Sequence, residues 1–117
     1  MNLPATAPTA PRRLCLFDLD GTLIPIDSDH AFGQFMVDIG WADGQTFRAR
    51  NDAFYADYQA GTLDLPAYVD FATSVWRCRP LDEAEAERER FMCEVLQPQL
   101  HEPAQALVRE HQARGDL

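Results

Sequence analysis

A short apolar run that ends in two aspartates constrains this chain more than any other feature. Residues 14–17 are Leu, Cys, Leu and Phe, and the sequence Asp-Leu-Asp-Gly-Thr-Leu follows at positions 18–23. An apolar run of this length before a turn signal predicts a buried strand of the kind found in parallel sheets. Ligands of open α/β sheets bind beyond the carboxyl ends of the strands. We therefore expect Asp18 and Asp20 to lie at a ligand site.

The residue types around this turn suit phosphate chemistry. Residues i and i+2 of a strand share a face, so Asp18 and Asp20 can line one pocket. A carboxylate can bind Mg²⁺ or attack as a nucleophile, and a second carboxyl group can transfer the proton. Gly21 permits a sharp turn whose N–H groups approach an anion, and Thr22 adds a hydroxyl donor. An alternative stays open, because Asp-Gly between apolar residues also forms hairpin turns.

Residues 17–23, Phe-Asp-Leu-Asp-Gly-Thr-Leu, resemble the first motif of the haloacid dehalogenase-like superfamily. The resemblance implies an α/β fold with a Rossmann-type sheet, a Mg²⁺ cofactor and phosphoryl transfer. Asp18 is then the nucleophile and Asp20 the general acid/base, and both are metal ligands, Asp20 through its backbone carbonyl. Gly21 and Thr22 are expected to bind the phosphate. The second acid favours a phosphatase over a dehalogenase.

Helical patterns follow the motif. Proline and glycine positions and the spacing of apolar residues predict helices rather than further strands. They cover approximately residues 27–39, 45–60, 66–78, 82–96 and 102–114.

The phosphoserine phosphatase-like branch of the superfamily inserts a helical cap directly after the first motif, and a helix then returns to the core. The resemblance therefore implies a first core strand with its motif loop at 13–26, a cap at 27–100 and a returning core helix at 101–117. The proline-containing residues 1–12 are expected to be a disordered leader. The superfamily's three later motifs have no counterpart here. We therefore expect the N-terminal half of a longer enzyme, with little or no turnover by itself.

Two further residues are candidates for substrate contact. Asp27 lies nine residues after Asp18, where phosphoserine phosphatases have a glutamate that contacts the polar end of the substrate. Asp27 is also a good N-cap for the first predicted helix, and the two roles are compatible. His30, next to Asp29, is either a further substrate contact or a surface histidine.

Charge and composition exclude several classes of partner. The formal net charge is −9, and all ten basic residues are arginines. This balance argues against nucleic acid or an anionic membrane as the main partner. The sequence has no stretch of 18 apolar residues and no signal-peptide pattern, and its three cysteines are an odd number without metal-ligand spacing. We expect a cytoplasmic protein by default.

Two functional hypotheses follow. The first is a Mg²⁺-dependent phosphomonoester hydrolase that acts through an aspartyl-phosphate on a small phosphorylated metabolite. The second is a non-catalytic truncated fragment that acts as a helical association module, pairing with another copy or with another chain, because an unpaired strand at 14–17 exposes an edge.

Overall fold

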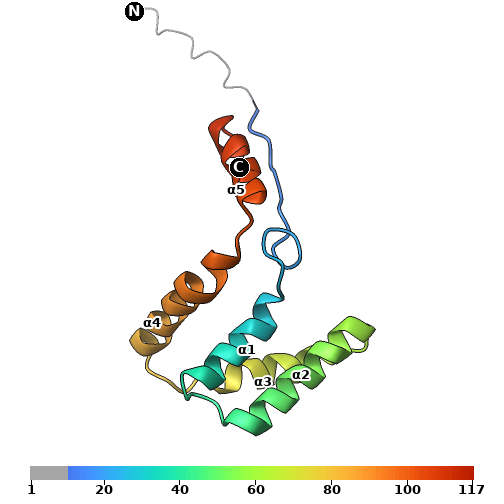
Figure 1. The fold of residues 1–117 in the computed structure, drawn as a ribbon, viewed down its shortest axis with the longest axis vertical. Helices are drawn as coiled ribbons and strands as arrows, with labels where there is room; N and C mark the ends of the chain where they lie inside the picture. Colours follow the sequence, from blue (N-terminus) through green and yellow to red (C-terminus); the bar gives the residue numbers. More distant parts are fainter. Residues whose placement is uncertain (1–10) are drawn as a thin grey trace, which may run out of the picture.

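Helices make up nearly all the regular structure of residues 11–117, the part of the chain that the computed structural model describes (Figure 1). Most of the leader predicted at 1–12 lies outside these residues. The elements are α1 (Ser28–Asp38), α2 (Gly44–Ala60), α3 (Leu65–Ser74), α4 (Leu81–Phe91), the π-helix η1 (Met92–Leu96), the 3₁₀ turn η2 (Gln97–Gln99) and α5 (Glu102–Ala113).

Local signals set the helix boundaries. The carboxylate of Asp27 accepts a hydrogen bond from the His30 N–H at 2.8 Å and caps α1. Asp64 caps α3 in the same way, and Gly61 ends α2 with a left-handed φ of 73°. The five predicted helices are confirmed, with two differences. The third was expected to reach residue 78 but ends at Ser74. The fourth was expected to stay α-helical to residue 96 but becomes a π-helix from Met92.

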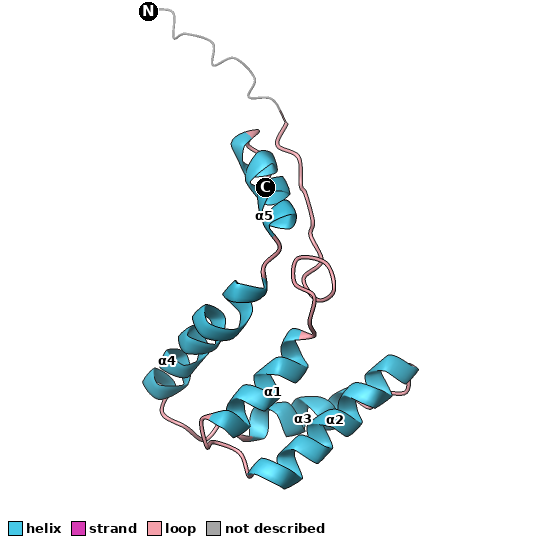
Figure 2. Ribbon diagram, in the orientation of Figure 1, coloured by secondary structure: helices cyan, strands magenta, loops and turns pink. Residues whose placement is uncertain are grey.

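The prediction of a strand at residues 14–17 is wrong for this structure. Figure 2 shows that segment as a loop, and no strand forms among residues 11–117. The Cys15 N–H donates to the Leu117 carbonyl and the Leu117 N–H to the Arg13 carbonyl, each at 2.8 Å. These two bonds have the pattern of a parallel pair. A single opposing residue cannot extend the ladder, so the segment is paired at one point only.

The main cluster of buried side chains comes from the motif loop, α1, the end of α4 and η1. Ile24 and Met36 are almost completely buried, and Phe35, Phe91 and Leu96 join them in one cluster. The rings of Phe32 and Phe91 meet edge to face, 5.0 Å apart. These contacts hold α4 alongside α1.

A second aromatic group joins α2 to α3. Phe47 of α2 stacks on Phe71 of α3 with ring centroids 4.3 Å apart, and Phe54 lies 5.0 Å from Phe71. The guanidinium of Arg50 covers the Phe71 ring at 4.8 Å. The first three helices therefore form one packed unit with α4.

The molecule is elongated, with extents of 72 × 34 × 28 Å and a radius of gyration of 20.0 Å. A compact domain of this length has a radius of gyration of about 13 Å. Figure 1 shows α5 and the N-terminal segment at one end and α1, α2 and α3 at the other. The motif loop at 18–24 lies between the two ends.

An ionic cluster fixes α5 to the N-terminal segment. The Asp116 carboxylate accepts hydrogen bonds from Arg13, with Nε at 3.1 Å, and lies 2.8 Å from His111 Nδ1. Only 6% of the Asp116 side chain is exposed. The hydrogen bond with His111, followed by that with Arg13, holds the pKa of Asp116 below its usual value of 3.8.

We predict that this cluster makes the contact between residues 13–15 and 116–117 depend on acid. A carboxyl group whose pKa is lower in the folded state stabilises the fold above its unfolded pKa, and that stabilisation is lost as the pH falls through the folded pKa. The Cys15 amide NMR signal should therefore keep its hydrogen-bonded shift at neutral pH and lose it below about pH 4, near the usual carboxyl pKa. Asp116→Asn should weaken the contact at neutral pH and remove this dependence, whereas Asp38→Asn should change neither. An unaltered Cys15 profile in Asp116→Asn would contradict the assignment.

Candidate active site

The motif loop is wound around a single carbonyl. The Leu19 carbonyl accepts hydrogen bonds from the N–H groups of Thr22, Leu23 and Ile24, at 3.2, 3.0 and 3.1 Å. Gly21 makes this possible with a φ of 71°, a left-handed conformation that other residues rarely adopt. The loop is thus a tight turn, without the antiparallel partner that the hairpin alternative requires.

Asp18 and Thr22 come together on the exposed side of this turn. The Thr22 hydroxyl donates to Asp18 Oδ2 at 2.6 Å, and both residues are exposed. This hydrogen bond leaves Asp18 Oδ1 accessible.

Asp20 is directed toward the first helix of the chain. Its Oδ1 accepts a hydrogen bond from the Ser28 N–H at 3.0 Å. Asp27 accepts a hydrogen bond from the His30 N–H, two residues further along the helix. Two carboxylates therefore bind two of the first N–H groups of α1, at a helix end where unpaired N–H groups and the helix dipole favour anions. Asp27 is thus an N-cap, and its contact with substrate remains a prediction.

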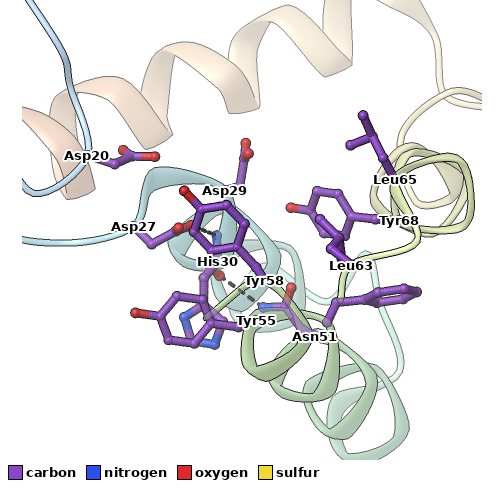
Figure 3. Close-up of a pocket in the computed structure, with 11 residues that line it drawn as sticks. Asp20, Asp27, Asp29, His30, Asn51, Tyr55, Tyr58, Leu63, Leu65 and Tyr68 are labelled. Carbon is purple, nitrogen blue, oxygen red and sulfur yellow. Dashed lines mark hydrogen bonds between the residues drawn. The ribbon is translucent and has the colours of Figure 1, made fainter. Parts of the chain in front are cut away.

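A pocket of about 160 Å³ opens beside Asp20, between the motif loop and the helices (Figure 3). Neither Asp18 nor Thr22 lines it. Its wall consists of three carboxylates, three tyrosines, two other polar residues and three apolar side chains: Asp20, Asp27, Asp29, Tyr55, Tyr58, Tyr68, His30, Asn51, Phe54, Leu63 and Leu65.

The carboxylates make this pocket electrically negative. The pKa of Asp29 is raised, first by burial and then by the charges of Asp27 and Asp20. Burial, followed by Asp29, Asp27 and Asp20, raises the pKa of Tyr68 to about 12. Burial disfavours any charged group at this place, and the neighbouring carboxylates further disfavour a negative charge.

His30 is held in the wall by three contacts. Its Nε2 lies 2.7 Å from Asp52 Oδ1, and its ring lies 4.8 Å from the ring of Tyr55. Its backbone carbonyl accepts a hydrogen bond from Asn51 Nδ2 at 2.9 Å. His30 therefore lines the pocket, and its contacts with Asp52 and Tyr55 hold its ring in place.

Asn51 is a site residue that was not singled out from the sequence. It is 2% exposed, the one buried polar residue among those described. Its signal in the sequence is a polar residue at helical spacing from the apolar Phe47 and Phe54. Gly33 of α1 provides the space, because a Cβ there would lie 2.5–2.6 Å from three Asn51 side-chain atoms.

Within residues 11–117, no group of three His, Cys, Asp or Glu side chains is close enough to hold a metal ion. No helix of these residues is long and apolar enough to cross a membrane.

Comparison with known proteins identifies the class. The sequence model of the haloacid dehalogenase-like hydrolases matches residues 15–117, so the chain belongs to this family. It is 41% identical over 106 residues to a histidinol-phosphatase of Neisseria meningitidis, covering 90% of this chain and 47% of the relative.

A solved structure from Bordetella pertussis, of a protein of unknown function, superimposes with a TM-score of 0.79 at 38% identity. The match covers 92% of this chain and 49% of that one. The fold is therefore that of the haloacid dehalogenase-like proteins, and this chain spans about half the length of the relatives it matches.

We predict that Gly33→Ala destabilises the helical unit, because the added methyl group collides with buried Asn51. Overpacking of this kind costs about 1–3 kcal/mol, which lowers Tm by about 4 °C or more for each kcal/mol in a small domain. Gly44→Ala is the matched control, since its Cβ would meet only Val37, at an ordinary 3.8 Å. Thermal unfolding of the two variants compares them directly. Equal Tm values would show that Asn51 is free to move aside.

Proposed function

We propose that this chain carries the nucleophile and the general acid/base of a Mg²⁺-dependent phosphomonoester hydrolase. The observation that carries the proposal is the arrangement of Asp18, Asp20 and Thr22 around one tight turn, with a pocket beside Asp20. Family membership and the histidinol-phosphatase relative support it. The substrate is a small phosphorylated metabolite, and histidinol phosphate is the first one to assay.

In this proposal Asp18 attacks phosphorus with Oδ1, the oxygen not engaged by Thr22. The bond between phosphorus and the ester oxygen breaks, and that oxygen takes a proton from Asp20. Water then attacks the aspartyl-phosphate and gives its proton to Asp20, while the bond between phosphorus and Asp18 breaks to release phosphate. Gly21 and Thr22, at the exposed turn, bind the phosphate oxygens.

The residues present fit Mg²⁺. It prefers oxygen ligands and is commonly held by one or two carboxylates together with substrate phosphate. The Asp18 carboxylate and the Asp20 backbone carbonyl are the proposed ligands. When bound, Mg²⁺ supplies positive charge that stabilises the transferring phosphoryl group.

The domain division remains part of the proposal. We propose that residues 13–26 and 101–117 belong to a Rossmann-type core and that residues 27–100 form a cap inserted between them. The hydrogen bond from the His101 N–H to the Leu23 carbonyl, at 3.2 Å, supports this division because it joins the two ends of the inserted segment. The pairing of Leu117 with Arg13 and Cys15 supports it at a second point.

We predict that Asp18→Asn abolishes phosphate release by the complete gene product. Loss of a covalent nucleophile removes the aspartyl-phosphate route, so we expect kcat to fall by roughly a thousandfold or more. The assay measures phosphate released from histidinol phosphate with Mg²⁺ and again with a chelator, which should also stop release. Asp57→Asn, an exposed change outside the pocket, is the control. Equal rates for wild type and Asp18→Asn would exclude Asp18 as the nucleophile.

A second candidate function, self-association, is favoured by exposed apolar side chains on the N-terminal segment. Leu14 is 71% exposed and Leu16 is 83% exposed. Exposed apolar residues on an unpaired extended segment favour association.

We predict that the chain sediments as a dimer or larger species at high concentration. Leu16→Lys should shift it toward monomer, because it places a charge on the exposed segment, whereas Leu81→Lys, at an exposed position on α4, should not. Monomeric wild-type protein at all concentrations would contradict this second function.

A further inference from the structure

Two arginines of this acidic chain differ from most of the others in having no partner among the described residues. Six of the ten arginines form ion pairs with carboxylates: Arg13, Arg48, Arg77, Arg90, Arg109 and Arg114. Pairing is the expected state, because the 19 acidic residues outnumber the arginines. Arg50 and Arg79 nevertheless form no ion pair and no side-chain hydrogen bond within residues 11–117.

Both of these side chains line the same pocket. It has a volume of about 330 Å³ and lies between the loop before α2, the first turns of α2 and the end of α3. Its polar lining residues are two arginines, one carboxylate and two hydroxyls: Arg50, Arg79, Asp43, Thr46 and Ser74. The rest of the lining is mainly aromatic and aliphatic. Two cations and one carboxylate give this pocket a net positive charge.

Aromatic rings hold the two guanidinium groups in place. Arg79 Cζ lies 4.5 Å from the centroid of the Trp41 ring, and Arg50 Cζ lies 4.8 Å from that of Phe71. The Phe71 ring is itself fixed, because it is 5% exposed and stacks on α2. A cation–π contact stabilises the charge but supplies no oxygen acceptor for the N–H donors of the group. The two guanidiniums are therefore positioned donors that lack an acceptor.

The first turn of α2 adds to the positive field. Asp43 occupies the N-cap position but makes no side-chain cap hydrogen bond, and the first turn contains no acidic residue. In α1 and α3, by contrast, an aspartate at this position accepts a backbone hydrogen bond. The first N–H groups of α2 therefore lack a cap acceptor, and the dipole of this 17-residue helix favours an anion beside them. The helix end and the two arginines favour the same kind of ligand.

We propose that this pocket binds an oxyanion, the phosphate or carboxylate group of a small molecule. Arg50 and Arg79 donate to its oxygens, since a guanidinium matches the geometry of either group. Thr46 and Ser74 offer hydroxyl donors in the same wall. Asp43 repels the anion and weakens its binding. The apolar part of the wall accommodates the body of the ligand.

This oxyanion site is distinct from the pocket beside Asp20. Thr46 lines the one and Tyr55 lines the other. The two residues are nine positions apart on α2, or about 14 Å along the helix axis. Figure 1 shows the start of α2 at the end of the molecule away from α5, with the motif loop between them. The site is therefore separate from the proposed hydrolase reaction.

The test is titration of this chain with sodium phosphate and, separately, with sodium acetate, followed through the NMR signals of the indole N–H groups. The chain has two tryptophans. Trp41 contacts Arg79 and lines the pocket, whereas Trp76 does not line it. Binding should shift the Trp41 signal saturably and leave the Trp76 signal in place, and the titration that does so identifies the group as phosphate, carboxylate or either. Sodium chloride at equal ionic strength should shift neither signal.

Variants test the role of the two arginines. Arg50→Gln and Arg79→Gln should each raise the dissociation constant by about tenfold, as expected for loss of a charge-assisted hydrogen bond. Arg88→Gln is the matched control. It removes an equal charge from an exposed arginine of α4 that forms no ion pair within residues 11–117, and it should leave the constant unchanged. Asp43→Asn should lower the constant, because it removes the repelling charge.

Four results would overturn the proposal. The first is the absence of a Trp41 shift with both phosphate and acetate, and the second is an equal shift with chloride. The third is weakening by Arg88→Gln as large as that by Arg50→Gln, since net charge alone would then explain the binding. The fourth is weaker binding in Asp43→Asn, because an anion gains nothing from a neighbouring carboxylate.

Discussion

The N-terminus of α1 is the point on which the site depends. Its first N–H groups have no partner within the helix, and the Ser28 and His30 groups are bound by the carboxylates of Asp20 and Asp27. Because Asp20 belongs to the motif loop, one hydrogen bond joins that loop to the helical unit. This bond directs the Asp20 side chain toward the first turn of α1.

The apolar residues on the two sides of the motif loop differ in burial. Ile24 follows the motif directly and is completely buried against α1 and the end of α4. Leu14 and Leu16, a few residues earlier, are mostly exposed. The motif loop is therefore anchored on its C-terminal side by packing, while its N-terminal side is held by the ionic cluster around Asp116 and by two backbone hydrogen bonds.

The sequence predicted the features that depend on local interactions. The helices follow from caps and periodicity, and Gly21 indicated a sharp turn, in which the structure gives it a φ of 71°. The strand at 14–17 could not be decided locally, because a strand exists only with a partner, and just Leu117 lies opposite. The expected α-helix through Leu96 likewise gave way to a π-helix where Leu96 enters the buried cluster.

The pocket shows a further limit of sequence reasoning. Asp27 was a candidate from the sequence because it lies at a fixed distance from Asp18 of the motif. Asn51 belongs to no motif and lies 24 residues after Asp27. Its role depends on a contact between helices: Gly33 of α1 admits the Asn51 side chain, and the His30 carbonyl orients it. A polar residue in an apolar helical stripe signals that something must satisfy it, but the sequence alone does not identify the partner.

Asp20 connects the fold with the proposed chemistry. Its Oδ1 accepts the hydrogen bond from the Ser28 N–H, so Oδ2 is the oxygen left to carry a transferable proton. An acid that must give a proton to the leaving group and then take one from water needs that oxygen to stay in one position through both steps. The helix terminus supplies this constraint without occupying the proton-bearing oxygen. In the proposed mechanism, a carboxylate that accepts a hydrogen bond from a helix N-terminus is therefore an acid held in one position.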